Sequence, residues 1–312
     1  MNSTDRARLI VLVGVAFASL SAIFIRLSDS PPLVIAFYRM LFTSAMLLPP
    51  YLLRLHRRRS DIGPQKHPVR VIALLLLSGV FLALHFATWI TSLRYTSVAS
   101  AVVLVTLHPV FVATGSIVFL RESVRPAVFL CIFSAIAGSI ILSLSNAGSE
   151  TGALTGNLLA VAGAVAVSGY MLIGRAVRRT VGVVTYNFSV YLTATVVLMV
   201  FVVLSGEPFS GYSLREFALF LALAFFCTIL GHSIFNWGLK YLPASFVSAS
   251  ILLEPISASV LAAVLFAEIP GPMALLGGFI VVASLFGVIR LDAQAKSSTV
   301  PAETVNDYGG VT

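Results

Sequence analysis

The chain of 312 residues carries 58% hydrophobic and only 10% charged residues, with a mean hydropathy of +1.00. A soluble domain carries roughly 25% charged residues, so this composition excludes a water-soluble fold and predicts an integral membrane protein. The net charge of +8 does not indicate nucleic-acid binding, because the basic residues lie in the gaps between apolar runs and form no basic face. Cys131 and Cys227 lie inside apolar runs, so no disulfide framework is indicated.

The apolar runs are each long enough for a helix that crosses a bilayer, which needs about 20 residues. We therefore expect an all-α integral membrane protein and not a β-barrel, whose strands would alternate with a period of two. The first run lacks a clear small-residue cleavage site, so we expect a transmembrane helix there and not a signal peptide. In chain order, the expected helices span residues 9–27, 33–53, 70–92, 97–119, 126–145, 153–174, 183–205, 215–239, 244–266 and 272–290.

Lys and Arg residues are distributed unequally between the two sides of these ten helices. Sixteen fall on the side that holds both termini and three on the other side, and Arg39 lies inside a helix. Because basic loops stay in the cytoplasm, we expect a multi-pass protein of the cytoplasmic (cell inner) membrane with both termini in the cytoplasm. The last residues, 292–312, are expected to form a disordered cytoplasmic tail.

The chain repeats itself at an offset of 146 residues. Residues 93–137 align without a gap on residues 239–283, so that Pro109 meets Pro255 and Glu122 meets Glu268. Chance similarity between apolar runs does not explain prolines and a glutamate at one fixed offset. We therefore expect two five-helix repeats, residues 8–146 and 153–291. Because five is odd, the second repeat enters the membrane in the opposite orientation, which is the inverted-repeat plan of many secondary transporters.

With these repeats, the chain resembles the EamA-type transporters of the drug/metabolite transporter superfamily over residues 8–291. The resemblance implies a secondary transporter for small organic metabolites, such as amino acids and related amphipathic solutes, that works in export or exchange. One departure is that His108 precedes the first proline whereas Glu254 precedes the second. The segments that carry the resemblance are Leu93-Arg94-Tyr95-Thr96-Ser97 through Pro109 to Leu120-Arg121-Glu122, and Leu239-Lys240-Tyr241-Leu242-Pro243 through Glu254-Pro255 to Phe266-Ala267-Glu268.

Glu254 and His108 lie near the middles of the helices expected at 244–266 and 97–119, and the repeat makes them symmetry mates. Ionisable side chains are costly at the bilayer centre, which makes both candidates for substrate binding or proton coupling. A packing role, with hydrogen bonds to neighbouring helices, stays open for each. Pro109 and Pro255 are expected to kink their helices, because proline removes a backbone donor and frees a carbonyl one turn earlier.

Two further helix faces combine aromatic and polar side chains. His85 and Trp89 share one face of the third helix, and His232 and Asn236 share one face of the eighth, with Trp237 adjacent. Together they predict a cavity suited to small amphipathic solutes or cations. For the two tryptophans, anchoring at the membrane interface is the alternative.

The second and seventh helices supply the remaining candidates, Tyr38, Arg39 and Asn187. An intramembrane arginine can bind a substrate carboxylate bidentately. It can equally extend its side chain to the outer surface, since Arg39 lies only about two turns into its helix. Both possibilities stay open for Arg39.

Motifs for other chemistry are missing from the sequence. There is no phosphate-binding loop, no H-E-x-x-H zinc motif and no G-x-S-x-G nucleophile elbow, so we expect no enzyme, no cofactor and no metal site. The expected protein is an alternating-access carrier with a small-molecule substrate and the proton as candidate coupling ion, present in the bilayer as a monomer or homodimer. A non-transporting membrane enzyme or receptor, or a channel, is the alternative on the same scaffold.

Overall fold

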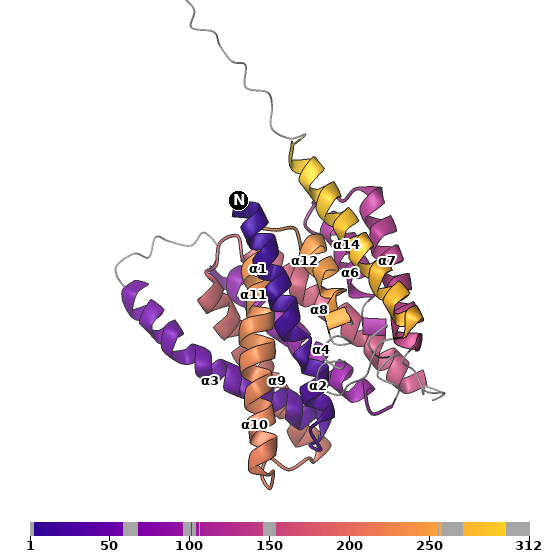
Figure 1. The fold of residues 1–312 in the computed structure, drawn as a ribbon. Helices are drawn as coiled ribbons and strands as arrows, with labels where there is room; N and C mark the ends of the chain where they lie inside the picture. The colour runs from indigo at the N-terminus through magenta and orange to yellow at the C-terminus, as the bar shows by residue number, and fades with distance from the viewer. Residues whose placement is uncertain are drawn as a thin grey trace, which may run out of the picture.

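A computed structural model describes residues 3–58, 68–95, 101, 104–105, 107–145, 154–254, 256–257 and 271–297. Within these residues every regular element is helical (Figure 1). The first half contains α1 (Ser3–Ala18), α2 (Leu20–Arg26), α3 (Pro32–Arg58), α4 (Pro68–Ser92), α6 (His108–Val118) and α7 (Pro126–Ser145). The second half contains α8 (Leu154–Val177), α9 (Val183–Ser205), α10 (Leu214–Ala222), η1 (Leu223–His232), α11 (Ser233–Gly238), α12 (Ala244–Ile251) and α14 (Pro272–Ser297).

These helices confirm the predicted all-α membrane fold. Within the described residues, six helices are long and apolar enough to cross a membrane: Thr4–Arg26, Pro32–His56, Val69–Ser92, Leu154–Val177, Val183–Ser205 and Leu214–Gly238. Shorter apolar helices lie at His108–Val118, Pro126–Gly138 and Leu275–Val288. The start of α1 and the end of α14 lie at the same end of the molecule (Figure 1).

Local chemistry sets many of the helix boundaries. Proline opens α3, α4, α7 and α14, where its missing N–H is one that a first turn leaves unpaired anyway. Gly206 ends α9 with a φ of 72°, a left-handed conformation that glycine adopts without strain. The helix α14 continues to Ser297, beyond the expected end at residue 290. Residues 298–312 of the expected tail lie outside the described part of the chain.

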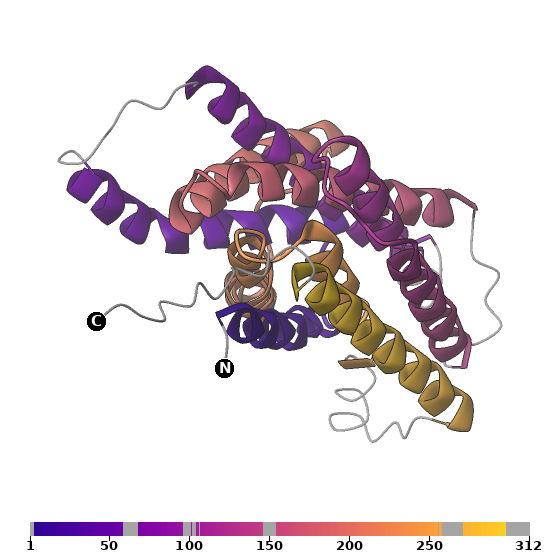
Figure 2. The ribbon, with the colours of Figure 1, turned by 90° about the horizontal axis from the view of Figure 1, so that it is seen from above.

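The most extensively packed helix pairs have equivalent packed pairs when the first and second halves of the chain are exchanged. α4 packs along α8, and in the same way η1 and α11 pack along α1. Three pairs map onto themselves under the exchange: α3 with α9, α6 with α12, and α7 with α14. The α7–α14 pair lies side by side at the edge of the bundle in both ribbon views (Figures 1 and 2).

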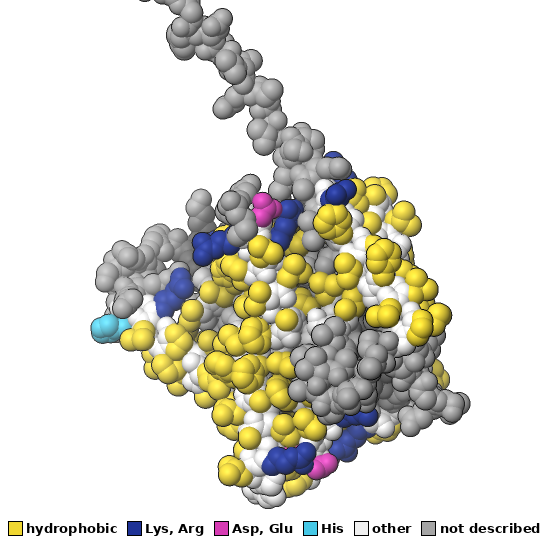
Figure 3. Space-filling model, in the orientation of Figure 1, with side chains coloured by type: hydrophobic (Ala, Val, Ile, Leu, Met, Phe, Trp, Pro, Cys, Tyr) yellow, Lys and Arg dark blue, Asp and Glu magenta, His cyan; other side chains and the backbone are white. Residues whose placement is uncertain are grey.

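The outer surface of the bundle is apolar. Hydrophobic side chains cover most of the face in Figure 3, whereas Lys and Arg gather at its two ends. Leu53, Val69, Phe119, Leu204 and Leu214 are each more than 60% exposed. Such side chains belong against hydrocarbon, and the basic residues belong at the headgroups.

Close approach of α7 and α14 depends on glycine. A Cβ added to Gly138 would lie 2.8 Å from the Gly277 carbonyl oxygen and 3.0 Å from Ile280. Without a driving force from water, helices in lipid associate through such small-residue contacts.

We therefore expect Gly138→Val to destabilise the protein by about 1–3 kcal/mol, the usual cost of overpacking a tight contact. Thermal unfolding of the purified protein in detergent measures this loss. The matched control is Ala137→Val, because Ala137 is the preceding residue of α7 and is exposed. Equal stability of the two variants would contradict the tight α7–α14 contact.

Candidate functional site

Arg39 is buried at the centre of the bundle, with 1% of its surface exposed. Its Nε donates to Thr228 Oγ1 (2.8 Å) and its Nη1 to Ser21 Oγ (3.0 Å). The guanidinium lies over the Phe86 ring at 4.3 Å from the centroid. The remaining nitrogen, Nη2, has no hydrogen-bond partner among the described residues. Arg39 thus joins α3 to α2, α4 and η1, and it does not extend to the surface.

The Thr228 hydroxyl, which accepts the hydrogen bond from Arg39 Nε, lies on a helix of unusual geometry. The segment η1 is a π-helix, and Thr228 Oγ1 itself donates to the Leu223 carbonyl five residues earlier (3.2 Å). π-Helical turns are rare and occur frequently at functional sites. The π-helix therefore marks the part of the eighth span that faces Arg39.

Glu254 lies just beyond the end of α12, at intermediate burial. Its carboxylate and the Arg39 guanidinium interact electrostatically. The two charges come from different halves of the chain. Three further side chains on neighbouring helices interact electrostatically with Arg39: Cys227, Tyr191 and Tyr170.

Three histidines surround this centre. His85 donates from Nδ1 to the Gly163 carbonyl (3.0 Å) and its ring stacks on Trp89 (6.0 Å, 1°). His232 packs edge-on against Phe86 (5.4 Å). His108 donates from Nδ1 to the Val105 carbonyl (3.0 Å). Among the described residues, Trp89 Nε1 is buried without a hydrogen-bond partner, so one polar atom beside the centre remains available to a ligand.

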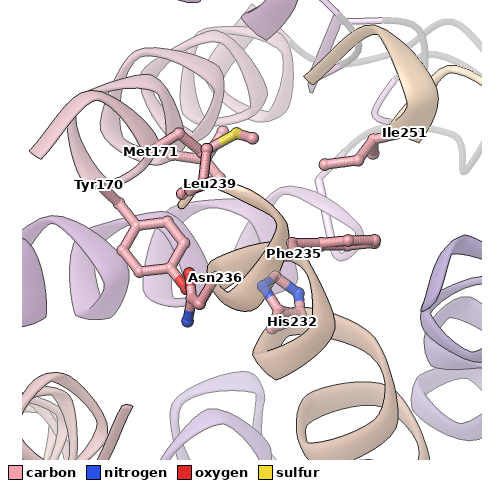
Figure 4. Close-up of a pocket in the computed structure, with 8 residues that line it drawn as sticks. Tyr170, Met171, His232, Phe235, Asn236, Leu239 and Ile251 are labelled. Carbon is pink, nitrogen blue, oxygen red and sulfur yellow. The ribbon is translucent and has the colours of Figure 1, made fainter. Parts of the chain in front are cut away.

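A small cavity opens beside His232 (Figure 4). It holds about 10 Å³, which is the space of about one water molecule. In the close-up, Tyr170 from α8 and Asn236 from α11 point toward one another, next to His232. The cavity is too small for an organic solute in this conformation. Its lining comprises Val167, Tyr170, Met171, His232, Phe235, Asn236, Leu239 and Ile251.

Both the nitrogen and the oxygen of the Asn236 side-chain amide form hydrogen bonds within the protein. Its Nδ2 donates to Asn187 Oδ1 (2.8 Å) and to the Tyr191 hydroxyl (3.1 Å), and its Oδ1 accepts from the Tyr170 hydroxyl (2.6 Å). The two asparagines predicted to contact substrate thus bind each other. Their network holds α8, α9 and α11 together and shapes one wall of the cavity.

Other predicted site residues lie elsewhere. Tyr38 stacks on Phe220 (5.1 Å, 1°) and its hydroxyl donates to the Phe209 carbonyl, so it belongs to an aromatic cluster near the α9–α10 connection. Trp237 packs against Tyr241 (4.8 Å) at the end of α11. Pro109 lies in the first turn of α6, where a missing N–H costs little, instead of within a continuous helix. Pro255 lies outside the described residues.

Both ends of the bundle are closed by a carboxylate. At one end, Glu216 accepts hydrogen bonds from Ser28 Oγ, from Ser30 Oγ (2.6 Å) and from the Asp29 N–H (3.3 Å). These bonds hold the α2–α3 connection against the first turn of α10. Sequence reasoning missed this closure, because only the fold brings the serines to Glu216.

The opposite end is closed by Glu122, which the sequence marked only through the repeat. Its Oε1 accepts from Arg175 Nε (2.8 Å) and from Arg179 Nη2 (2.8 Å). Arg175 also donates to the Leu239 carbonyl (2.8 Å), which lies just after α11. This closure joins the α6–α7 connection to the ends of α8 and α11.

Known proteins resemble the chain along most of its length. The EamA-like transporter family matches residues 6–144 and 154–290. A solved crystal structure shares the fold, with a TM-score of 0.75 at 18% identity over 94% of this chain and 99% of that chain. An "Uncharacterized transporter" of Archaeoglobus fulgidus is 23% identical over 92% of this chain and 97% of its own length. The "Uncharacterized transporter YetK" of Bacillus subtilis is 24% identical over 65% of this chain and 62% of its own length.

We expect Asn236→Leu to destabilise the protein, because Asn187 and Tyr170 lose their bonds to Asn236, whereas the Tyr191 hydroxyl keeps Ser233. Each unsatisfied polar group costs about 1–3 kcal/mol. Thermal unfolding in detergent measures the change. The comparison variant, Tyr170→Phe, removes a single hydroxyl and should cost less; the reverse order of stabilities would contradict the central place of Asn236 in the network.

Proposed function

Because this chain belongs to the EamA-like transporter family and is therefore a multi-pass membrane transporter, we propose that it carries small organic metabolites by alternating access. The observation that carries this proposal is the unpartnered Nη2 of Arg39, a buried cation at the meeting of the two halves. A fixed positive charge with a free donor in a low-dielectric centre is a binding group for an anionic part of a substrate.

The proposed substrates are amino acids or related amphipathic carboxylates. The free Nη2 of the Arg39 guanidinium can donate a charge-assisted hydrogen bond to a carboxylate. Phe86 and the His85–Trp89 stack offer flat apolar surface beside it. A site with a few polar groups among aromatic walls suits a molecule that has one charged end and one apolar end.

Alternating access follows from an inverted repeat, which the packing pattern supports. Swapping the two halves converts each of the most extensively packed helix pairs into a packed pair. The family also matches the chain twice, once in each half. Each end then opens by the movement that closes the other. Both carboxylate closures are formed among the described residues, and we propose that this conformation is an occluded state.

The proposed setting is the cytoplasmic membrane, with both termini inside. The uneven distribution of Lys and Arg supports this orientation. It places the Glu216 closure on the outer side and the Glu122 closure on the cytoplasmic side. We propose export or exchange as the direction of transport, and the proton, bound at Glu254, as the coupling ion.

We expect Arg39→Gln to lower the rate of saturable solute uptake into proteoliposomes by about tenfold to a hundredfold, because a hydrogen bond to a charged group contributes about 1.5–3 kcal/mol. A panel of radiolabelled amino acids and monocarboxylates serves as the assay.

The matched control for Arg39→Gln is Arg26→Gln, since Arg26 is exposed at the end of α2. Unchanged flux in Arg39→Gln would remove Arg39 from the substrate site. Flux without saturation in the native protein would indicate a channel, and no flux of any solute would indicate a non-transporting receptor.

A further inference from the structure

The charges at the centre of the bundle nearly balance. Within the described part of the chain, Arg39 donates hydrogen bonds to two hydroxyls, those of Thr228 and Ser21. Among the described residues, Glu254 is the one carboxylate that interacts electrostatically with it. One buried cation therefore interacts with one partly buried carboxylate that comes from the other half of the chain.

The other titratable groups around this pair lie on η1, α9, α8, α4 and α6. They are Cys227 and His232 on η1, Tyr191 on α9, Tyr170 on α8, His85 on α4 and His108 on α6. Among them, Cys227 interacts electrostatically with the Glu254 carboxylate, and burial favours the uncharged form of all these groups. The net charge of the centre is thus set by Arg39 and Glu254.

An uncompensated charge in a dry core is costly, so a bound ligand must leave this centre close to neutral. A monocarboxylate that binds the free Nη2 of Arg39 adds one negative charge. The centre returns to neutrality only if the Glu254 carboxylate takes a proton from the solvent. A zwitterionic amino acid adds no net charge, because its carboxylate pairs with Arg39 and its ammonium with the ionised Glu254.

We propose that Glu254 takes up one proton when a small monocarboxylate binds at Arg39 and none when a zwitterionic amino acid binds. The same site then moves monocarboxylates together with a proton and moves amino acids without one. The charge of the substrate, and not a separate ion site, decides whether transport depends on the proton gradient. This inference rests on the proposed transport function, whose substrate site it refines.

The sign of the pH dependence follows from this balance. The complex with a monocarboxylate holds one more proton than the free protein, so binding strengthens as pH falls. Where Glu254 is ionised in the free protein, the apparent affinity for a monocarboxylate falls about tenfold for each unit of rising pH. The affinity for an amino acid does not change over the same range.

Two probes with the same ring test the proposal: phenylacetate, a monoanion, and phenylalanine, a zwitterion. Calorimetric titration of the purified full-length protein in buffers of different ionisation enthalpy counts the protons taken up per bound molecule. Across a pH series on both sides of neutrality, we expect the count to approach about one for phenylacetate and to stay near zero for phenylalanine.

Glu254→Gln fixes the uncharged form of the side chain and provides the decisive variant. It should bind phenylacetate with no proton uptake and no pH dependence, and it should bind phenylalanine more weakly than the native protein does. Glu207→Gln makes the same chemical change in the connection between α9 and α10 and should leave both proton counts as they are.

Equal proton counts for the two probes would overturn the proposal, as would proton uptake that persists in Glu254→Gln or the absence of binding by both probes. Flux into proteoliposomes separates this proposal from the transport function. The predicted proton counts without any flux would contradict transport and leave the charge balance intact. Saturable flux of both probes with equal counts would contradict the charge balance alone.

Discussion

The burial of one guanidinium constrains the whole centre of this protein. A charged side chain inside a membrane protein is costly unless its donors are satisfied and its charge is balanced. Arg39 meets part of this demand through Thr228, Ser21 and the face of Phe86. These partners come from three different helices, so the position of each helix at the centre is tied to the others through a single side chain.

What Arg39 lacks is as informative as what it contacts. Its Nη2 has no partner in the part of the chain that the structure describes, and the carboxylate of Glu254 interacts with Arg39 electrostatically from the other half of the chain. A purely structural arginine would be expected to use all of its donors, because an unmade bond in a dry core costs free energy. The π-helix that presents Thr228 is a second departure from regular structure at the same point.

The polar contacts away from the centre have a different character. The Asn236 network is complete in itself, so it stabilises the packing of α8, α9 and α11. The Glu216 and Glu122 closures lie at the two ends of the bundle and hold connections between helices. Hydrogen bonds between helices in lipid contribute only modestly, and closures of this strength can open and form again during a transport cycle.

Much of the fold was predictable from the sequence, because lipid imposes a minimum length of apolar residues on each span. The all-helical membrane fold and the membership of the EamA-like transporter family are confirmed, whereas parts of the helices expected at 97–119 and 244–266 lie outside the described residues. The inverted orientation of the repeats, the location of the termini and the roles of Glu254 and His108 stay predictions.

The partners of individual side chains were not predictable. Spacing placed Asn236 on a polar face, but only the packing of α9 against α11 brings Asn187 to it. The sequence left Arg39 free to reach the surface, since the rotation of α3 and the π-helical turn at Thr228 decide its direction. A π-helix has no hydrophobic period that would reveal it. Serine and threonine are common in membrane helices, so Ser21 and Thr228 carried no signal.

Distances across the two closures test alternating access about Arg39 most directly. Spin labels at Leu27 and Leu214 span the Glu216 closure, and labels at Ser123 and Tyr241 span the Glu122 closure; all four positions are exposed. Pulsed electron paramagnetic resonance in lipid nanodiscs would compare both distances with and without a saturating transported solute. We expect one distance to lengthen as the other shortens. Two distances that stay unchanged, or that lengthen together, would contradict alternating access.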